Sequence, residues 1–255
     1  MTVSGIRCFR ALAIFALACA AHGVLAAAPC NAPWMHQGGG FSLTAEPGGH
    51  VTEFTVADFA KTDSANCKGT IRTDFSLTVA GQTTRSQASV ALEIAGGKVR
   101  PPSESTSGQM QAGSGNGAMS VALQAQASGL LSYISEVTAE GQRLPGTRTE
   151  MSMSGMLSKL GAAAGQISVP NMVLVTSEKV VGKQEQLDTP LGHYQCWPIS
   201  YTRRQEGPAA MMAMSGSFNA VTQVVDHFCP ASGLVMREDM TVNDKQSSQA
   251  VTALH

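Results

Sequence analysis

Apolar and polar side chains alternate with a period of two along much of this chain. Mostly apolar residues occupy every second position of residues 71–79 and again of residues 88–94, on either side of a turn-like stretch at 80–84. Such alternation is typical of a strand that buries one face and exposes the other. The two runs therefore predict a long antiparallel hairpin with one apolar face.

Similar runs predict further strands before and after this hairpin. They cover residues 41–43, 51–58, 119–128, 147–154, 172–181, 193–203, 217–229 and 234–241. Residues 156–164 predict a short helix, whereas residues 130–140 fit either a helix or a strand. A loop is expected around residues 206–216. We therefore predict a mainly β protein, an antiparallel curved sheet or half-barrel with one or two short helices, and leave a closed barrel and a sandwich open.

Residues 100–117 interrupt the alternation. They begin with two prolines and continue with Ser, Gly and Gln, a composition that is flexible and cannot build a core. The stretch is either a linker between two subdomains or a long loop within one. We favour the loop, because the preceding part is thin for a domain, and we expect residues 27–255 to form a single β-rich domain.

The N-terminal residues 1–26 resemble a secretory signal peptide. Arg7 and Arg10 precede an apolar stretch, and Val24-Leu25-Ala26 provides a cleavage site. A retained membrane anchor and a lipid-modified Cys19 are the alternatives. We expect cleavage after Ala26 and a mature protein in the bacterial periplasm that does not span the membrane.

Cleavage would leave four cysteines, which in an exported protein predict two disulfides. They are Cys30, Cys67, Cys196 and Cys229. Four cysteines allow three connectivities. Antiparallel partners lie at equal distances from their turn, and the point midway between Cys196 and Cys229 falls inside the predicted loop at 206–216. We therefore favour the pairs Cys196–Cys229 and Cys30–Cys67.

Charge is scarce in this sequence. Only 14% of the residues are charged, against about 25% in ordinary soluble domains, and the formal net charge is −1. Loss of Arg7 and Arg10 with the signal peptide would leave 15 basic and 18 acidic residues, a net charge of −3. This balance argues against nucleic acid as a partner, because such binding needs a basic surface.

Familiar catalytic and metal motifs are missing from the sequence. It contains no Gly-x-Ser-x-Gly, Ser-x-x-Lys or His-Glu-x-x-His. His193, Cys196, His227 and Cys229 have the composition of a zinc site, but His193 and Cys196 would face opposite sides of a strand. Asp226 and His227 cannot pair directly for the same reason, and we expect a partly exposed strand pair. We expect no catalytic residue, metal or cofactor.

Two methionine-rich segments share the pattern Met-x-Met-Ser-Gly. Their methionines are Met151, Met153, Met156, Met211, Met212 and Met214. Thioethers pack in cores, line adaptable apolar binding surfaces and bind Cu(I). All three roles remain open here, and these six residues are our candidates for lining a ligand site.

Two segments in residues 187–240 resemble a known group of proteins. Residues 189–199 read Thr-Pro-Leu-Gly-His-Tyr-Gln-Cys-Trp-Pro-Ile, and residues 229–238 read Cys-Pro-Ala-Ser-Gly-Leu-Val-Met-Arg-Glu. They are similar to strand and turn motifs of uncharacterised periplasmic half-barrel proteins whose architecture is related to the lipoprotein carriers LolA and LolB. The resemblance implies a curved sheet with an apolar concave side suited to lipid or peptide, and it does not imply catalysis.

These observations predict a non-enzymatic binding or carrier protein of the cell envelope for a hydrophobic ligand or envelope component. Its partner would be a lipid, a lipoprotein or another envelope protein. The alternatives are a structural or interaction protein of the envelope and, less favoured, a hydrolase whose residues are dispersed in the sequence.

Overall fold

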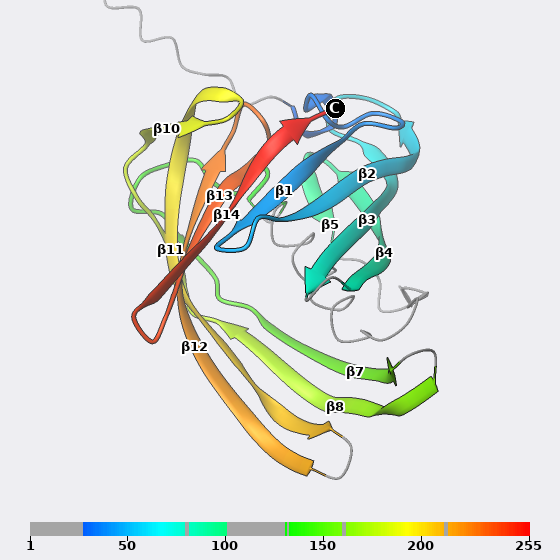
Figure 1. Cartoon of the computed structure of the whole chain (residues 1–255). Coiled ribbons are helices and arrows are strands. Elements are labelled where there is room, and N and C mark those ends of the chain that lie inside the picture. The colour runs from blue at the N-terminus through cyan, green and yellow to red at the C-terminus, as the bar shows by residue number, and fades with distance from the viewer. Residues whose placement is uncertain (1–27, 80–81, 101–130, 132, 160–161, 212–213) are drawn as a thin grey trace, which may run out of the picture.

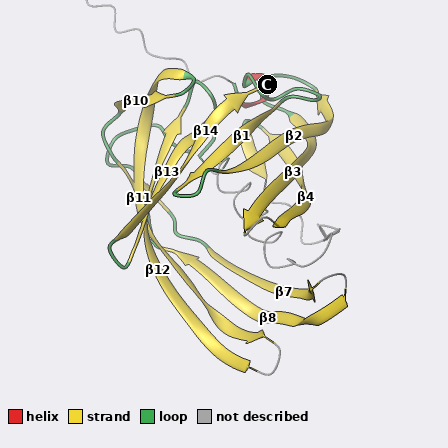
Figure 2. Ribbon diagram, in the orientation of Figure 1, coloured by secondary structure: helices red, strands yellow, loops and turns green. Residues whose placement is uncertain are grey.

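The computed structural model describes residues 28–79, 82–100, 131, 133–159, 162–211 and 214–255. These residues form one antiparallel sheet that curves without closing, as Figures 1 and 2 show. The helical structure among them is a three-residue 3₁₀ turn, Pro29–Asn31. The predicted mainly β class and open, curved sheet are therefore confirmed.

Fourteen strands build the sheet. In chain order they are β1 (Gly40–Glu46), β2 (His50–Lys61), β3 (Cys67–Val79), β4 (Gln82–Ala95), β5 (Lys98–Arg100), β6 (Arg143–Leu144), β7 (Arg148–Lys159), β8 (Ala162–Thr176), β9 (Lys179–Val181), β10 (Glu185–Thr189), β11 (Gly192–Met211), β12 (Met214–Cys229), β13 (Leu234–Val242) and β14 (Lys245–Leu254). Their order in the sheet is β5-β4-β3-β2-β1-β14-β13-β12-β11-β8-β7, while β9 and β10 also pair with β11, and β6 pairs with β9.

The first predicted hairpin is confirmed as β3 and β4. Their pairing runs from Cys67 opposite Ile94 to Val79 opposite Gln82. Its buried side chains follow the predicted alternation, with Ile71 buried and the preceding and following positions of β3 outside the core. The turn is shorter than expected, because β4 already begins at Gln82.

The hairpin of β11 and β12 has the register that the cysteine positions predict. Trp197 lies opposite Phe228, and the pairing continues without a shift to Met211 opposite Met214. The loop expected around residues 206–216 is therefore wrong, because both strands extend to the end of the hairpin. Pro208, which cannot donate a ladder hydrogen bond, lies where the register of β11 against β8 shifts, a position in which strands tolerate proline.

Three other predictions need correction. The helix expected at 156–164 is wrong, because this stretch ends β7 and begins β8, and their mutual pairing overrides local preference. Residues 133–140 form turns, neither helix nor strand. The run 172–181 is divided between β8 and β9, and the sequence pattern missed β10 and β14. The predicted strand at 119–128, residues 1–26 and residues 101–117 lie outside the described residues.

The hydrophobic core fills one end of the sheet's inner face, the face that carries Phe41, Phe54 and Ile199. Segment 29–36 and the turn that contains Tyr133 close this end from outside the sheet, and Trp34 is fully buried there. Both predicted disulfides are present, Cys30–Cys67 and Cys196–Cys229. Within the described residues, no helix is long and apolar enough to cross a membrane.

Candidate functional site

Part of the sheet extends beyond the core. We call this part the arm: β7, β8 and the adjoining residues 203–211 of β11 and 214–222 of β12, which project away from the other strands in Figure 1. On β11 and β12 the last fully buried apolar side chains toward the arm are Ile199 and Val224. Beyond these two residues, Leu174 and Val175 of β8 are only half-buried. The arm therefore presents apolar side chains that the core does not cover.

A cluster of polar side chains lies on the inner face at the base of the arm. We call it the inner cluster; its members are Tyr133, Lys179, Tyr201, Arg203, Asp226 and Glu238. Asp226 and Glu238 are directly opposite each other on β12 and β13, and they are only 4% and 8% exposed. Two carboxyl groups so close together in a buried place need compensating partners.

Residues from outside β12 and β13 surround Asp226. The Tyr133 hydroxyl donates a hydrogen bond to Asp226 Oδ2 at 2.5 Å. The Lys179 ammonium lies 4.8 Å from the centre of the Tyr133 ring and 5.1 Å from that of Tyr201, which are cation–π distances. Asp226 Oδ1 is buried and has no hydrogen-bond partner among the described residues. The carboxyl group is thus only half satisfied.

Glu238 is better satisfied than Asp226. Arg203 Nη2 lies 3.2 Å from Glu238 Oε1, and Gln249 Nε2 donates to Glu238 Oε2 at 3.1 Å. Both carboxylate oxygens of Glu238 therefore have a donor, whereas Asp226 has one for Oδ2 alone among the described residues.

The inner cluster holds a proton more tightly than ordinary carboxylates do. Burial, and then the charge of Glu238, raise the pKa of Asp226 to about 7, although the hydrogen bond from Tyr133, the nearby hydroxyl of Tyr201 and the charge of Lys179 act in the opposite direction. Burial likewise raises the pKa values of Tyr133 and Tyr201, and lowers that of Lys179. Asp226 therefore favours its protonated form more than an exposed aspartate does.

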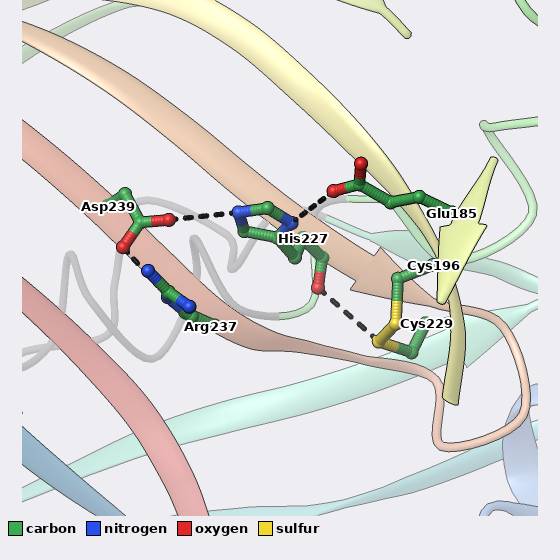
Figure 3. A network of polar contacts seen from close by, with 6 residues as sticks. All are labelled: Glu185, Cys196, His227, Cys229, Arg237 and Asp239. Atoms are coloured by element: carbon green, nitrogen blue, oxygen red, sulfur yellow. Dashed lines mark hydrogen bonds and ion pairs between the residues drawn. A yellow bond between two sulfur atoms is a disulfide. The ribbon is translucent and has the colours of Figure 1, made fainter. Parts of the chain in front are cut away.

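A second polar network, shown in Figure 3, lies on the outer face of β12. His227 Nε2 is 3.0 Å from Asp239 Oδ2, and its Nδ1 is 3.3 Å from Glu185 Oε1. Arg237 Nε donates to the other oxygen of Asp239 at 2.8 Å. Beside this network, a polar groove of about 660 Å³ runs between the β1–β2 turn and the β13–β14 hairpin, with Arg237 and Asp239 in its lining.

Asp226 and His227 therefore belong to different networks on opposite faces, as expected of strand neighbours. The expected partial exposure is wrong, because both residues are buried. The four residues with the composition of a zinc site do not form one. Cys196 and Cys229 are joined in a disulfide, and His193 Nδ1 lies 2.6 Å from the exposed Asp188. In the described part of the chain, no group of three His, Cys, Asp or Glu residues could hold a metal ion.

The backbone brings the two methionine-rich segments into the same arm. Met151, Met153 and Met156 lie on β7, and Met211 lies opposite Met214 at the end of the β11–β12 hairpin. Strand β8 separates the two segments. Met212 and the side chains of all six methionines are outside the described part, so a role in lining a ligand site remains a prediction.

Sequence reasoning missed the inner cluster as a group. One signal for it exists, because Asp226 has the same parity on β12 as the buried Val224 and Phe228. A carboxylate at a core position of a strand is unusual and indicates a compensating network. No pattern in the sequence, however, connects it with Tyr133 or Lys179, which come from a turn and a three-residue strand.

Comparison with known proteins identifies no family for this chain. No family model matches the chain, and no curated protein does. Two solved structures are similar at 11% identity, each over 86% of this chain and 96% of the other: a "putative lipoprotein" of Parabacteroides distasonis ATCC 8503, with a TM-score of 0.46, and a "putative exported protein with YmcC-like fold" of Bacteroides fragilis NCTC 9343, with a TM-score of 0.44. These scores are too low to carry an argument, and neither structure is named as a LolA or LolB carrier.

Proposed function

We propose that this protein is an exported, non-enzymatic binding or carrier protein of the bacterial periplasm, and that the inner face of the arm receives a hydrophobic ligand. The observation that supports the proposal is that Leu174, on the inner face of the arm, is only half-buried beyond the end of the core. A sheet face with apolar side chains is normally covered by a second layer. A bound apolar molecule would supply that cover.

The disulfides support the part of the proposal that concerns export. Cys30–Cys67 and Cys196–Cys229 include all cysteines that remain after removal of the predicted signal peptide. Such bonds form and persist in oxidising compartments and are rare in the cytosol. Together with the signal-like residues 1–26, they favour the periplasm.

A binding role accounts for the polar networks better than catalysis does. The carboxyl groups of Asp226 and Glu238 are buried among their own partners, and His227 is on the other face of the sheet. A catalytic acid or base must reach the proton that it transfers. We therefore assign both networks to the organisation of the fold.

Two neighbouring residues of β8 provide a matched test of the ligand site. Leu174 has the strand parity of Thr176, which lies opposite the inward-facing Arg203, whereas Val175 lies opposite Arg204 on the outer face. Leu174→Asp is expected to weaken binding of the apolar fluorophore N-phenylnaphthylamine at least about tenfold, because the charge would enter an apolar contact. Val175→Asp adds the same charge to the outer face and should leave the affinity within about twofold. Fluorescence titration measures both.

Two outcomes would contradict the proposed ligand site or the carrier role. Equal affinities of the two variants would place the fluorophore elsewhere, and absence of fluorophore binding together with absence of lipid in native mass spectra of the protein purified from its source would contradict the carrier role. Both variants need circular dichroism spectra like that of the wild type for the comparison to hold.

A role as a structural or interaction protein is the second candidate, and one observation favours it. Strand β7 ends the order of strands in the sheet. An edge strand can pair with an added strand of a partner. Photo-crosslinkers placed along β7 in living cells should then capture one stoichiometric envelope protein, whereas a pure carrier would give no such product.

A further inference from the structure

The polar groove beside the β1–β2 turn belongs to the outer face of the sheet and is separate from the arm. Arg237, Asp239 and Thr241 occupy alternate positions of β13 and line it. They share the face of His227, because Arg237 and His227 are directly opposite each other on β13 and β12. The groove's volume of about 660 Å³ falls within the range of about 300–1,000 Å³ that small-molecule sites have.

Strand pairing brings polar side chains of three strands together in this groove. Ser248 of β14 lies opposite Asp239, and Gln246 lies opposite Thr241. Ser248 also lies opposite Glu46 at the end of β1. Directly opposite residues of antiparallel strands point to the same face of the sheet. All five residues line the groove, and each has a side chain that forms hydrogen bonds.

A buried histidine holds one wall of the groove from behind. His227 is only 8% exposed, and its Nε2 lies 3.0 Å from Oδ2 of Asp239, as Figure 3 shows. Because a carboxylate oxygen only accepts, Nε2 carries the proton in this contact. Arg237 Nε donates to Oδ1 of Asp239 at 2.8 Å, so both carboxylate oxygens have a fixed partner. Polar groups that are oriented in this way lose little freedom when a ligand binds.

Arg237 keeps hydrogen-bond donors for a ligand. Its side chain is 45% exposed, and among the described residues its Nη1 and Nη2 have no hydrogen-bond or ion-pair partner. A guanidinium group has five N–H donors in one plane, and the contact with Asp239 uses the donor on Nε. The two terminal NH₂ groups can therefore donate to ligand oxygens in the groove.

The charges around the groove favour an uncharged ligand. Arg237 is positive, whereas Asp239 and Glu46 are negative. An anion would meet two carboxylates and a cation would meet the guanidinium group, so neither finds a surface of complementary sign. The hydroxyl of Ser248 and the amide of Gln246 both donate and accept. Such a mixture complements a molecule with many hydroxyl groups, because each hydroxyl also donates and accepts.

We propose that this groove binds an uncharged polyhydroxy compound, a saccharide of one or two rings, whose hydroxyl groups contact Arg237, Asp239 and Ser248. The outer network, which organises the fold, also positions Asp239 and Arg237 for this contact. The groove and the apolar inner face of the arm are different surfaces. The proposal therefore goes beyond the hydrophobic ligand and does not rest on it.

Nuclear magnetic resonance titration of the whole, disulfide-bonded protein tests the class of ligand. Methyl glucoside is uncharged, whereas glucuronate and glucosamine have a similar size and carry one negative or one positive charge. Methyl glucoside and maltose are expected to shift the amide signals of Gly48, Gly49 and Ser248 in a saturable manner, with dissociation constants on the order of 1 mM. The two charged sugars should bind at least about fivefold more weakly than methyl glucoside.

Two outcomes of this titration would overturn the proposal. One is that neither methyl glucoside nor maltose shifts these amides in a saturable manner. The other is that glucuronate or glucosamine binds more tightly than methyl glucoside, which would mean that charge rather than hydroxyl groups is recognised. Amides of the β3–β4 hairpin, which is remote in the order of strands, serve as the internal reference and should not shift.

Two arginine substitutions provide a matched comparison. Arg237→Gln removes the charged donors from the groove and should weaken the binding of methyl glucoside at least about tenfold. Arg100→Gln removes an exposed arginine that lies 3.6 Å from Glu93 on β4, and should leave the affinity within about twofold. Equal affinities of the two variants, with circular dichroism spectra like that of the wild type, would overturn the proposed contact.

Ser248→Ala keeps the test decisive if Arg237→Gln does not fold. It removes one hydroxyl from the groove and should weaken the binding of methyl glucoside at least about threefold, and an unchanged affinity would contradict the site. Leu174→Asp should leave this affinity unchanged, because Leu174 lies on the arm. Failure of the saccharide site can therefore be distinguished from failure of the hydrophobic ligand site.

Discussion

Replacement of Trp34 by alanine is expected to lower the free energy of unfolding by about 3–5 kcal/mol. The side chain is 0% exposed, and its ring packs edge-on against Phe41 with 5.3 Å between the centroids. Its indole N–H donates to the carbonyl oxygen of Ser232 at 3.0 Å. The substitution would therefore leave both a cavity and an unpaired buried carbonyl. Urea unfolding followed by circular dichroism measures the loss.

Two controls separate the contributions. Trp34→Phe keeps an aromatic ring but loses the indole donor, and should cost less than the alanine variant. Trp197→Ala removes the second tryptophan, which is only half-buried, and should cost about half as much or less. If Trp34→Ala stayed within about 1 kcal/mol of the wild type, segment 29–36 would not be part of the cooperative core.

The hairpin of β11 and β12 shows how much of the fold could be predicted. The position midway between Cys196 and Cys229 in the sequence predicts the register of the hairpin. The reason is that the residue numbers of antiparallel partners keep a constant sum until a bulge intervenes. The structure has no shift between Trp197–Phe228 and Met211–Met214. The hairpin of β3 and β4 was predictable from its alternation, which the structure shows where its side chains are described: buried and exposed positions alternate over residues 71–74 and 89–94.

Predictions failed where turn-forming residues occur inside strands. Gly207 and Pro208 favour a loop when the sequence is considered locally, yet both lie in β11, which pairs with β12 on one side and with β8 on the other. The register shift against β8 accommodates the proline. Strand β14 was missed for a different reason: Gln249 occupies a buried position in which the alternation would require an apolar residue.

The inner cluster was beyond prediction because it is made by tertiary structure. Asp226 and Glu238 meet through strand pairing, but Tyr133 arrives from a turn after residues 101–130, and Lys179 from a strand of three residues. Each of these residues, taken alone in the sequence, gives only a weak indication of a buried polar cluster. By contrast, the opposite orientation of Asp226 and His227 follows from strand geometry alone, which excludes a direct pair between them.

Removal of the disulfide Cys196–Cys229 by a double alanine substitution is expected to lower the free energy of unfolding by about 3–4 kcal/mol. The bond closes a loop with a sequence separation of 33 residues, and the expected loss is the entropy that the unfolded chain regains. The native register should persist, since the pairing of β11 with β12 continues as far as Met211 and Met214. Urea unfolding measures the loss, and crosslinking of paired positions checks the register.

The matching double substitution of Cys30 and Cys67 should have a different local effect. Its sequence separation is 37 residues, so the entropic loss is nearly the same, about 3–4 kcal/mol. However, Cys30 connects segment 29–36 to β3, whereas no strand pairing of its own holds that segment. In a Trp197→Phe background, which leaves Trp34 as the single tryptophan, the fluorescence maximum should therefore shift to longer wavelength in this variant, well below the unfolding midpoint, but not in the Cys196–Cys229 variant. An identical Trp34 signal in both would mean that the buried side chains alone, rather than the disulfide, hold segment 29–36 in place.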